Sequence, residues 1–211
     1  MPRQKYMQPI AQRIAAMKDG TVFIVSDLLD IASLPTVNMA LSRLSARGDI
    51  RRVMRGIYEK PRYSRLLGEL VATDPTKTAY AIARKNRWSV APTGEAALNL
   101  LRLSTQVPVV WIYASDGPYK EYSCGGVKIS FRHTSNKEIT GYSPITILLI
   151  QALRALGRKH VGETEIKTLQ RNLSEENKKI ALGETQGITS WIYDLIKQIC
   201  ADHISNEGRD S

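Results

Sequence analysis

The order of secondary structure encoded by the first 60 residues limits the possible folds of this chain more than any other feature. Apolar residues recur at helical spacing in two segments, Ser26 can cap a short helix between them, and Pro35 is expected to break that short helix. Gly48 stands where a helix C′ residue is expected. The pattern predicts a helix over 4–17, a strand over 21–25, a helix over 27–31, a turn over 32–35, a helix over 36–47, and two strands over 49–53 and 56–60 joined by a tight turn at 54–56.

A helix, a turn, a second helix and a two-stranded hairpin, in this order, are typical of a winged helix-turn-helix. The helical wheel of segment 36–47 predicts that Val37, Ala40, Leu41 and Leu44 are buried together. Thr, Asn, Ser and Arg side chains on the remaining faces are of the types that reach base edges or phosphates in a major groove. The expected DNA-binding residues are therefore Thr36, Asn38, Ser42, Arg43 and Arg47 on the helix, and Arg51, Arg52 and Arg55 on the hairpin.

The charge distribution supports a polyanionic partner for this first region. The chain has 30 Lys and Arg residues against 20 Asp and Glu residues, a formal net charge of +10. Up to Arg65 there are 12 basic and 5 acidic residues, whereas the rest of the chain has 18 basic and 15 acidic residues. The excess positive charge thus lies in the first third, as expected for a segment that binds double-stranded DNA.

The rest of the chain is predicted to form a mixed α+β domain that ends in helices. Asp74 and Pro75 provide an N-cap and a first helical residue, and Gly125 and Gly126 are expected to form a hairpin turn. We expect three domains or segments: 1–62 as the winged helix-turn-helix, 63–204 as the α+β domain and 205–211 as a polar tail. In the second region the pattern predicts helices over 65–72, 75–86, 95–103, 144–156, 163–173, 174–182 and 185–203, and strands over 87–90, 107–113, 119–124 and 127–131.

No enzyme signature is visible in the sequence. The histidines His133, His160 and His203 are not at metal-ligand spacing with one another, with a cysteine or with a carboxylate, and Cys124 and Cys200 are far apart. The phosphate-binding glycine motifs and the nucleophile elbow do not occur. We therefore expect no catalytic residue, no cofactor and no metal. Without a long apolar run or a signal peptide, we expect a cytoplasmic protein that does not enter the membrane.

Three stretches of the sequence resemble the AbiEi family, the antitoxins of type IV toxin–antitoxin systems. The first runs from Ile10 to Phe23 and continues at Asp27-Leu28, and the second runs from Ala40 through Gly48-Asp49-Ile50 to Arg52–Tyr58. The third and most specific is TGEAALNLLRLSTQVP, residues 93–108, with KISFRH at 128–133 downstream. The resemblance covers roughly residues 10–135 and does not include the helical end from Ser143.

The resemblance implies a bacterial repressor that controls its own toxin operon. The N-terminal domain would bind inverted repeats in the promoter, and Arg43, Arg51, Arg52 and Arg55 match the family's basic DNA-contacting region. The C-terminal domain would counter a nucleotidyltransferase-like toxin without forming a stable complex with it.

Three alternatives stay open at the level of the sequence. The chain could be a winged-helix repressor whose second domain senses a small ligand. It could be an enzyme that processes nucleic acid and uses the winged helix as a targeting module. Finally, the winged helix could mediate protein contacts only.

Overall fold

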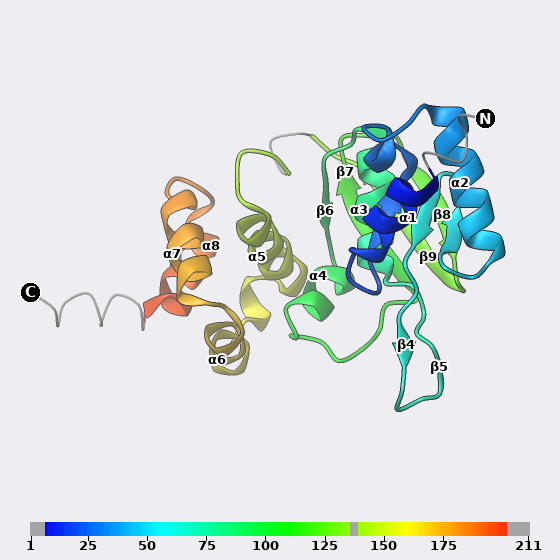
Figure 1. Cartoon of the computed structure of the whole chain (residues 1–211). Helices are drawn as coiled ribbons and strands as arrows, with labels where there is room; N and C mark the ends of the chain where they lie inside the picture. The colour runs from blue at the N-terminus through cyan, green and yellow to red at the C-terminus, as the bar shows by residue number, and fades with distance from the viewer. Residues whose placement is uncertain (1–6, 136–138, 202–211) are drawn as a thin grey trace, which may run out of the picture. The chain divides into compact units, whose positions relative to one another are not determined.

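The computed structural model describes residues 7–135 and 139–201, which divide into two compact units (Figure 1). Unit 1 contains the residues up to Trp88 together with Tyr122–Ile129, and unit 2 contains Ser89–Glu121 and the residues from Ser130 onward. The expected domain boundary after residue 62 falls inside unit 1, because the helix over residues 75–86 packs against strands of this unit. The expected tail 205–211 lies outside the described residues.

Unit 1 combines helices with two small antiparallel sheets. The larger sheet has the strand order β1-β3-β2, and both of its strand pairs are antiparallel. The two strands β4 and β5 form a separate hairpin. The elements are α1 (Met7–Ala15), β1 (Val22–Ile24), the 3₁₀ helix η2 (Val25–Leu28), α2 (Leu34–Ala46), β2 (Arg51–Met54), β3 (Ile57–Glu59), β4 (Tyr63–Ser64), β5 (Glu69–Leu70) and α3 (Pro75–Asn86).

The core of unit 1 confirms the helical wheel of α2. All four residues predicted to share its buried face are buried: Val37, Ala40, Leu41 and Leu44. They pack in one cluster with residues of α1 and of the sheet, where the rings of Phe23 and Tyr58 stack with centroids 6.0 Å apart. Gly48 has a φ of 81° and lies directly after the C-cap Arg47, as predicted for a C′ glycine.

Two predictions about the segment before α2 are wrong. A 3₁₀ helix from Val25 to Leu28 replaces the α-helix expected over 27–31, so Ser26 lies inside the helix and is not its N-cap. Asp27 stabilises this turn instead, because its carboxylate accepts a hydrogen bond of 3.0 Å from the Ile24 N–H. Pro35 lies in the first turn of α2, where its missing N–H has no intrahelical partner to lose, and so it belongs to the helix rather than to the turn before it.

The helix predicted over 65–72 is also wrong, since these residues belong to the β4–β5 hairpin. Tyr63 lies opposite Leu70, and Ser64 lies opposite Glu69. The loop between the strands is closed by Gly68, whose φ of 68° is disfavoured in a helix interior and whose N–H donates to the Ser64 carbonyl at 2.9 Å. The apolar spacing does not stabilise a helix here, because the leucines of this segment are exposed and their burial contributes no packing energy.

The helix over 75–86 agrees with the prediction at both ends. Asp74 is its N-cap, and the Asp74 carboxylate accepts hydrogen bonds from the N–H groups of Thr76, at 2.8 Å, and Lys77, at 3.3 Å. Arg87 ends α3 with a left-handed backbone at φ 59°. The following strand consequently begins at Val90 and not at residue 87 as predicted.

Unit 2 is built around helices that follow the strands, so the predicted mixed α+β class with a helical end is confirmed. The third sheet has the strand order β6-β7-β9-β8, and Gly125 and Gly126 form the predicted turn between β8 and β9. The elements that follow α3 are β6 (Val90–Pro92), α4 (Glu95–Leu100), β7 (Val110–Ser115), β8 (Lys120–Cys124), β9 (Val127–His133), α5 (Pro144–Leu156), the 3₁₀ helix η4 (Arg158–His160), α6 (Glu163–Asn172), α7 (Glu175–Glu184) and α8 (Ser190–Ile199). Among them, Tyr122–Ile129, which include the end of β8 and the start of β9, belong to unit 1.

The main core of unit 2 lies among α4, α5, α6, α7 and α8. The last helix starts five residues later than predicted, because Thr185 is the C-cap of α7 and Gly187 has a φ of 91°. His203, which was expected in this helix, lies outside the described residues. No helix in the described part of the chain is long and apolar enough to cross a membrane.

Candidate nucleic-acid interface

The helix α2 presents polar side chains beside its buried face. Asn38, Ser42 and Arg43 are exposed, whereas Thr36 is partly buried. The hydroxyl groups of Thr36 and Ser33 are 3.1 Å apart and hydrogen-bonded, so Thr36 contributes to the start of the helix. Because the opposite face of α2 is fixed in the core, Asn38 and Ser42 project from a rigid support.

The β2–β3 hairpin places two arginines at its exposed side. Arg52 lies in β2 opposite Tyr58, and Arg55 lies in the turn that connects the strands. The register shifts between Arg52 and Met54, which indicates a bulge near the turn. Gly56 closes the turn with a φ of 76°, a backbone conformation that is strained for residues with a side chain.

These two elements border a groove with a volume of about 590 Å³. Four of the eight residues singled out from the sequence line it together: Asn38, Ser42, Arg52 and Arg55. Three basic side chains and no carboxylate occur among the lining residues, so the groove has a positive potential suited to an anion. The remaining lining residues are Ile24, Val25, Ser26, Leu29, Leu34, Gly56, Tyr58 and Lys85.

Lys85 is the basic residue of the groove that the sequence pattern did not identify. It comes from the last turn of α3, and its Nζ donates a hydrogen bond of 2.6 Å to the Arg55 carbonyl at the hairpin turn. A Cβ placed on Gly56 would lie 3.5 Å from the same Nζ, so lysine and turn are in close contact. The neighbouring Arg84 pairs with Asp27 at 3.1 Å and thereby joins α3 to η2.

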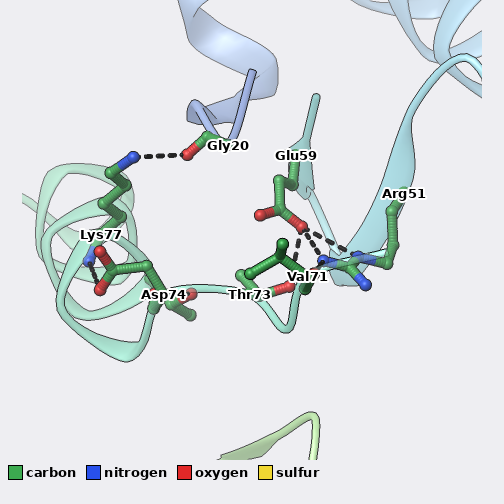
Figure 2. A network of polar contacts seen from close by, with 8 residues as sticks. Gly20, Arg51, Glu59, Val71, Thr73, Asp74 and Lys77 are labelled. Atoms are coloured by element: carbon green, nitrogen blue, oxygen red, sulfur yellow. Dashed lines mark hydrogen bonds and ion pairs between the residues drawn. The ribbon is translucent and has the colours of Figure 1, made fainter. Parts of the chain in front are cut away.

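Arg51 does not line the groove but holds a buried polar network together (Figure 2). Its Nε and Nη2 donate to one carboxylate oxygen of Glu59, whose side chain is only 3% exposed. Thr73 donates its hydroxyl to the same oxygen at 2.8 Å, and Arg51 Nη2 also donates to the Val71 carbonyl at 2.9 Å. The network ties the segment after β5 to the β2–β3 hairpin.

Arg47 also lies apart from the groove, in an exposed ion pair with Asp49 at 2.7 Å. These two residues line a smaller cavity of about 340 Å³ together with Lys60 and residues of α1. Lys60 Nζ donates to the carbonyls of Ala15, at 2.9 Å, and Met17, at 2.8 Å. Lys60 therefore stabilises the C-terminal end of α1 by capping its carbonyl groups. Its role at this cavity is structural.

Within the described residues, no group of three or more His, Cys, Asp and Glu side chains is arranged to hold a metal ion. The two thiols are suppressed as nucleophiles, since a raised pKa lowers the thiolate fraction. Burial raises the pKa of Cys124, and the Glu59 carboxylate raises it further, against the opposing effects of Arg51 and of a hydrogen bond from Thr78. Burial likewise raises the pKa of Cys200 to about 11.

The structure thus defines a mixed α+β protein of two compact units, the first of which carries a positively charged groove between a helix and a hairpin. The model of the DUF6088 family, a family of unknown function, matches residues 9–181, and the chain belongs to this family. No curated protein matches the chain.

Proposed function

We propose that unit 1 is a winged helix-turn-helix that binds double-stranded DNA and that the protein acts as a sequence-specific transcriptional repressor. The observation that carries the proposal is the groove, in which polar residues of α2 and basic residues of the hairpin converge without any carboxylate. In this arrangement α2 enters the major groove and the β2–β3 hairpin is the wing, which contacts the backbone or the adjacent minor groove.

The roles of the groove residues follow from their chemistry and exposure. Asn38 and Ser42 can hydrogen-bond base edges, and the exposed Arg43, one residue further along α2, is suited to a guanine. Arg52 and Arg55 provide phosphate contacts from the wing. Lys85 adds a third positive charge and fixes the backbone of the wing turn.

The contacts of the other predicted residues support a different role for them. Arg51 is engaged by Glu59 and Val71, and Arg47 by Asp49, so their charges are already partly neutralised. We therefore propose that these two arginines and Thr36 position the recognition surface and that Asn38, Ser42, Arg43, Arg52, Arg55 and Lys85 contact DNA.

The salt dependence of DNA binding tests this assignment. Fluorescence polarisation would compare the duplex upstream of the protein's own gene with a scrambled duplex, at several salt concentrations. Because each lost phosphate contact reduces the slope of log K against log salt by about 0.9, Arg52→Ala and Arg55→Ala should each flatten it by that amount on both duplexes. Arg43→Ala should reduce the preference for the upstream duplex, by about 1–3 kcal/mol if Arg43 contacts a guanine.

The matched control is Arg132→Ala, which removes one exposed arginine from unit 2. It should leave the slope and the sequence preference unchanged. If the groove variants bind both duplexes with the wild-type slope and affinity, the groove is not the DNA-binding surface.

We further propose, from the resemblance to the AbiEi antitoxins, that the repressor controls its own operon and counters a nucleotidyltransferase-like toxin without a stable complex. This part concerns unit 2 and can be tested separately. A strain that expresses the neighbouring gene of the operon should stop growing, and co-expression of the Arg52→Ala/Arg55→Ala variant should restore growth although DNA binding is weakened. If the wild-type chain does not restore growth, the antitoxin proposal is wrong and the repressor proposal is unaffected.

A further inference from the structure

The β4–β5 hairpin exposes a concentrated set of large apolar side chains. Leu66 is 94% exposed and Leu67 is 65% exposed in the loop at its tip. Tyr63, at 57%, and Leu70, at 54%, lie directly opposite each other and therefore share one face of the two-stranded ladder. On ordinary protein surfaces exposed apolar residues are scattered singly. A contiguous group of this kind therefore marks an interaction surface.

The hairpin is firmly attached to unit 1 at its base. The Val71 N–H donates to the Arg62 carbonyl at 2.8 Å, and the Val71 carbonyl accepts from Arg51 in the buried network (Figure 2). At the tip, Ser64 accepts hydrogen bonds from the N–H groups of Leu67, at 3.2 Å, and Gly68, at 2.9 Å. Figure 1 shows the hairpin extending away from the other elements of its unit as an arm.

The position of the arm separates it from the proposed DNA-binding groove. Its base is joined to Arg51, the first residue of β2, whereas the turn of the β2–β3 hairpin is formed by Arg55 and Gly56 at the other end of that strand. None of the residues of the arm is among those that line the groove. The arm is thus free to contact a second macromolecule while the groove is occupied.

We propose that the β4–β5 arm is a dimerisation element that packs against the same arm of a second copy of this chain. An aromatic side chain buries about 150–250 Å² when fully covered and a leucine somewhat less, so the exposed fractions of Tyr63 and the three leucines amount to at most roughly 500 Å² per chain. Two arms could then bury up to roughly 1,000 Å², the area at which a specific but weak interface begins. An interface of this size is tested at micromolar concentrations and above.

The charges on the arm are self-complementary, as a two-fold interface requires. Arg65 lies before the apolar tip and Glu69 after it, both are exposed, and neither makes an ion pair within the described residues. In an isologous contact both chains use the same surface, so if residue i of one chain contacts residue j of the other, residue j of the first also contacts residue i of the second. Two arms packed antiparallel can therefore pair Arg65 of each chain with Glu69 of its partner.

Sedimentation equilibrium of the full chain between 1 and 100 μM tests the proposal. The wild type should show a monomer–dimer equilibrium, and Leu66→Glu/Leu67→Glu should raise the dissociation constant at least tenfold. Val109→Glu is the matched control, because Val109 is an 85% exposed apolar residue of unit 2. It should leave the equilibrium unchanged. A wild type that stays monomeric at 100 μM, or a dimer that tolerates both glutamates, overturns the proposal.

A charge exchange tests the pairing itself. Arg65→Glu and Glu69→Arg should each weaken the dimer several-fold, and the double variant should recover wild-type affinity within about twofold. A double variant weaker than either single variant would overturn the antiparallel arrangement. Binding of Leu66→Glu/Leu67→Glu to a duplex with a single binding site should equal that of the wild type, so loss of the dimer is distinguishable from failure of the DNA-binding proposal. Far-UV circular dichroism verifies that each variant is folded.

Discussion

The buried ion pair between Arg51 and Glu59 permits a quantitative test of which arginines serve the fold and which serve the groove. The Glu59 side chain is 3% exposed and accepts hydrogen bonds from two nitrogens of Arg51 and from Thr73. Removing one partner of a buried pair costs about 3–5 kcal/mol, because the other charge is left without compensation. Since the Arg51 side chain is 33% exposed, water recovers part of that energy.

We therefore expect Glu59→Gln to lower the free energy of unfolding by about 2–3 kcal/mol. Urea denaturation monitored by circular dichroism measures this difference. The double variant Arg51→Met/Glu59→Leu replaces both charges by apolar groups of similar volume, and it should lie within about 1 kcal/mol of the wild type because no charge is then buried alone. The two variants together separate the cost of an unpaired charge from the net contribution of the pair.

The same double variant tests the role of Arg51 on DNA. It should bind the upstream duplex with the wild-type salt slope, whereas Arg55→Ala should keep wild-type stability and lose about 0.9 of the slope. If the double variant loses a full unit of slope, Arg51 contacts a phosphate and its structural assignment is wrong. If Glu59→Gln costs less than about 0.5 kcal/mol, the buried network does not stabilise unit 1 as reasoned.

Variants at three further residues test the groove and the interior of unit 2. Lys85→Met should flatten the salt slope by about 0.9, while Lys85→Arg keeps it, as measured by fluorescence polarisation. The Glu184 carboxylate is destabilised by burial, but hydrogen bonds from Thr146 and from the N–H and hydroxyl of Ser143 outweigh this effect and lower its pKa. Its stabilisation is therefore present above pH 4.5 and is lost as the pH falls through the lowered pKa, so the urea stability gap between wild type and Glu184→Gln should narrow as the pH falls below 4.5. Burial raises the pKa of Cys200 to about 11, so the protonated thiol stabilises the fold below pH 9 and this contribution is lost between pH 9 and 11. Cys200→Ala should lose less stability than the wild type across that interval, and equal losses would contradict the assignment.

Local patterns were sufficient to predict α2 and the β2–β3 hairpin, two of the elements that border the groove. The spacing of Val37, Ala40, Leu41 and Leu44 fixed the buried face of α2 and therefore which of its side chains are exposed. Gly48 ended that helix by the expected mechanism, and the hairpin that carries Arg52 and Arg55 formed where alternation and turn residues predicted it. These features depend on contacts within a few residues, which a sequence pattern expresses directly.

The role of Arg51 could have been found from the sequence, although it was not. A turn at 54–56 in a two-stranded hairpin brings residue 51 opposite residue 59, and the structure shows this register between Arg51 and Glu59. An arginine and a glutamate directly across from each other form a favourable pair. The participation of Val71 and Thr73 could not be predicted, because Val71 was expected inside a helix over 65–72 and Thr73 in the connection directly after it.

The error at 65–72 shows the limit of apolar spacing as evidence. Leu66, Leu67 and Leu70 have helical spacing, but spacing predicts a helix only where another element covers the apolar face. In the structure these side chains are exposed, and the backbone follows the preference of Gly68 for positive φ. The three leucines whose spacing suggested a helix are therefore the exposed residues from which the proposed dimerisation arm is built.

Lys85 could not be predicted because it reaches the groove from a helix that begins 21 residues after the end of β2. Its contact with the Arg55 carbonyl exists only once α3 has packed against β1 and β3. Arg84 with Asp27 and Lys77 with the Gly20 carbonyl anchor the same helix at two more points. A hairpin turn that is held by a neighbouring helix loses less conformational entropy when it binds DNA, so α3 contributes to affinity through rigidity as well as charge. The functional surface therefore requires the whole of unit 1 up to Trp88, and a fragment that ends at residue 62 would lack both contributions.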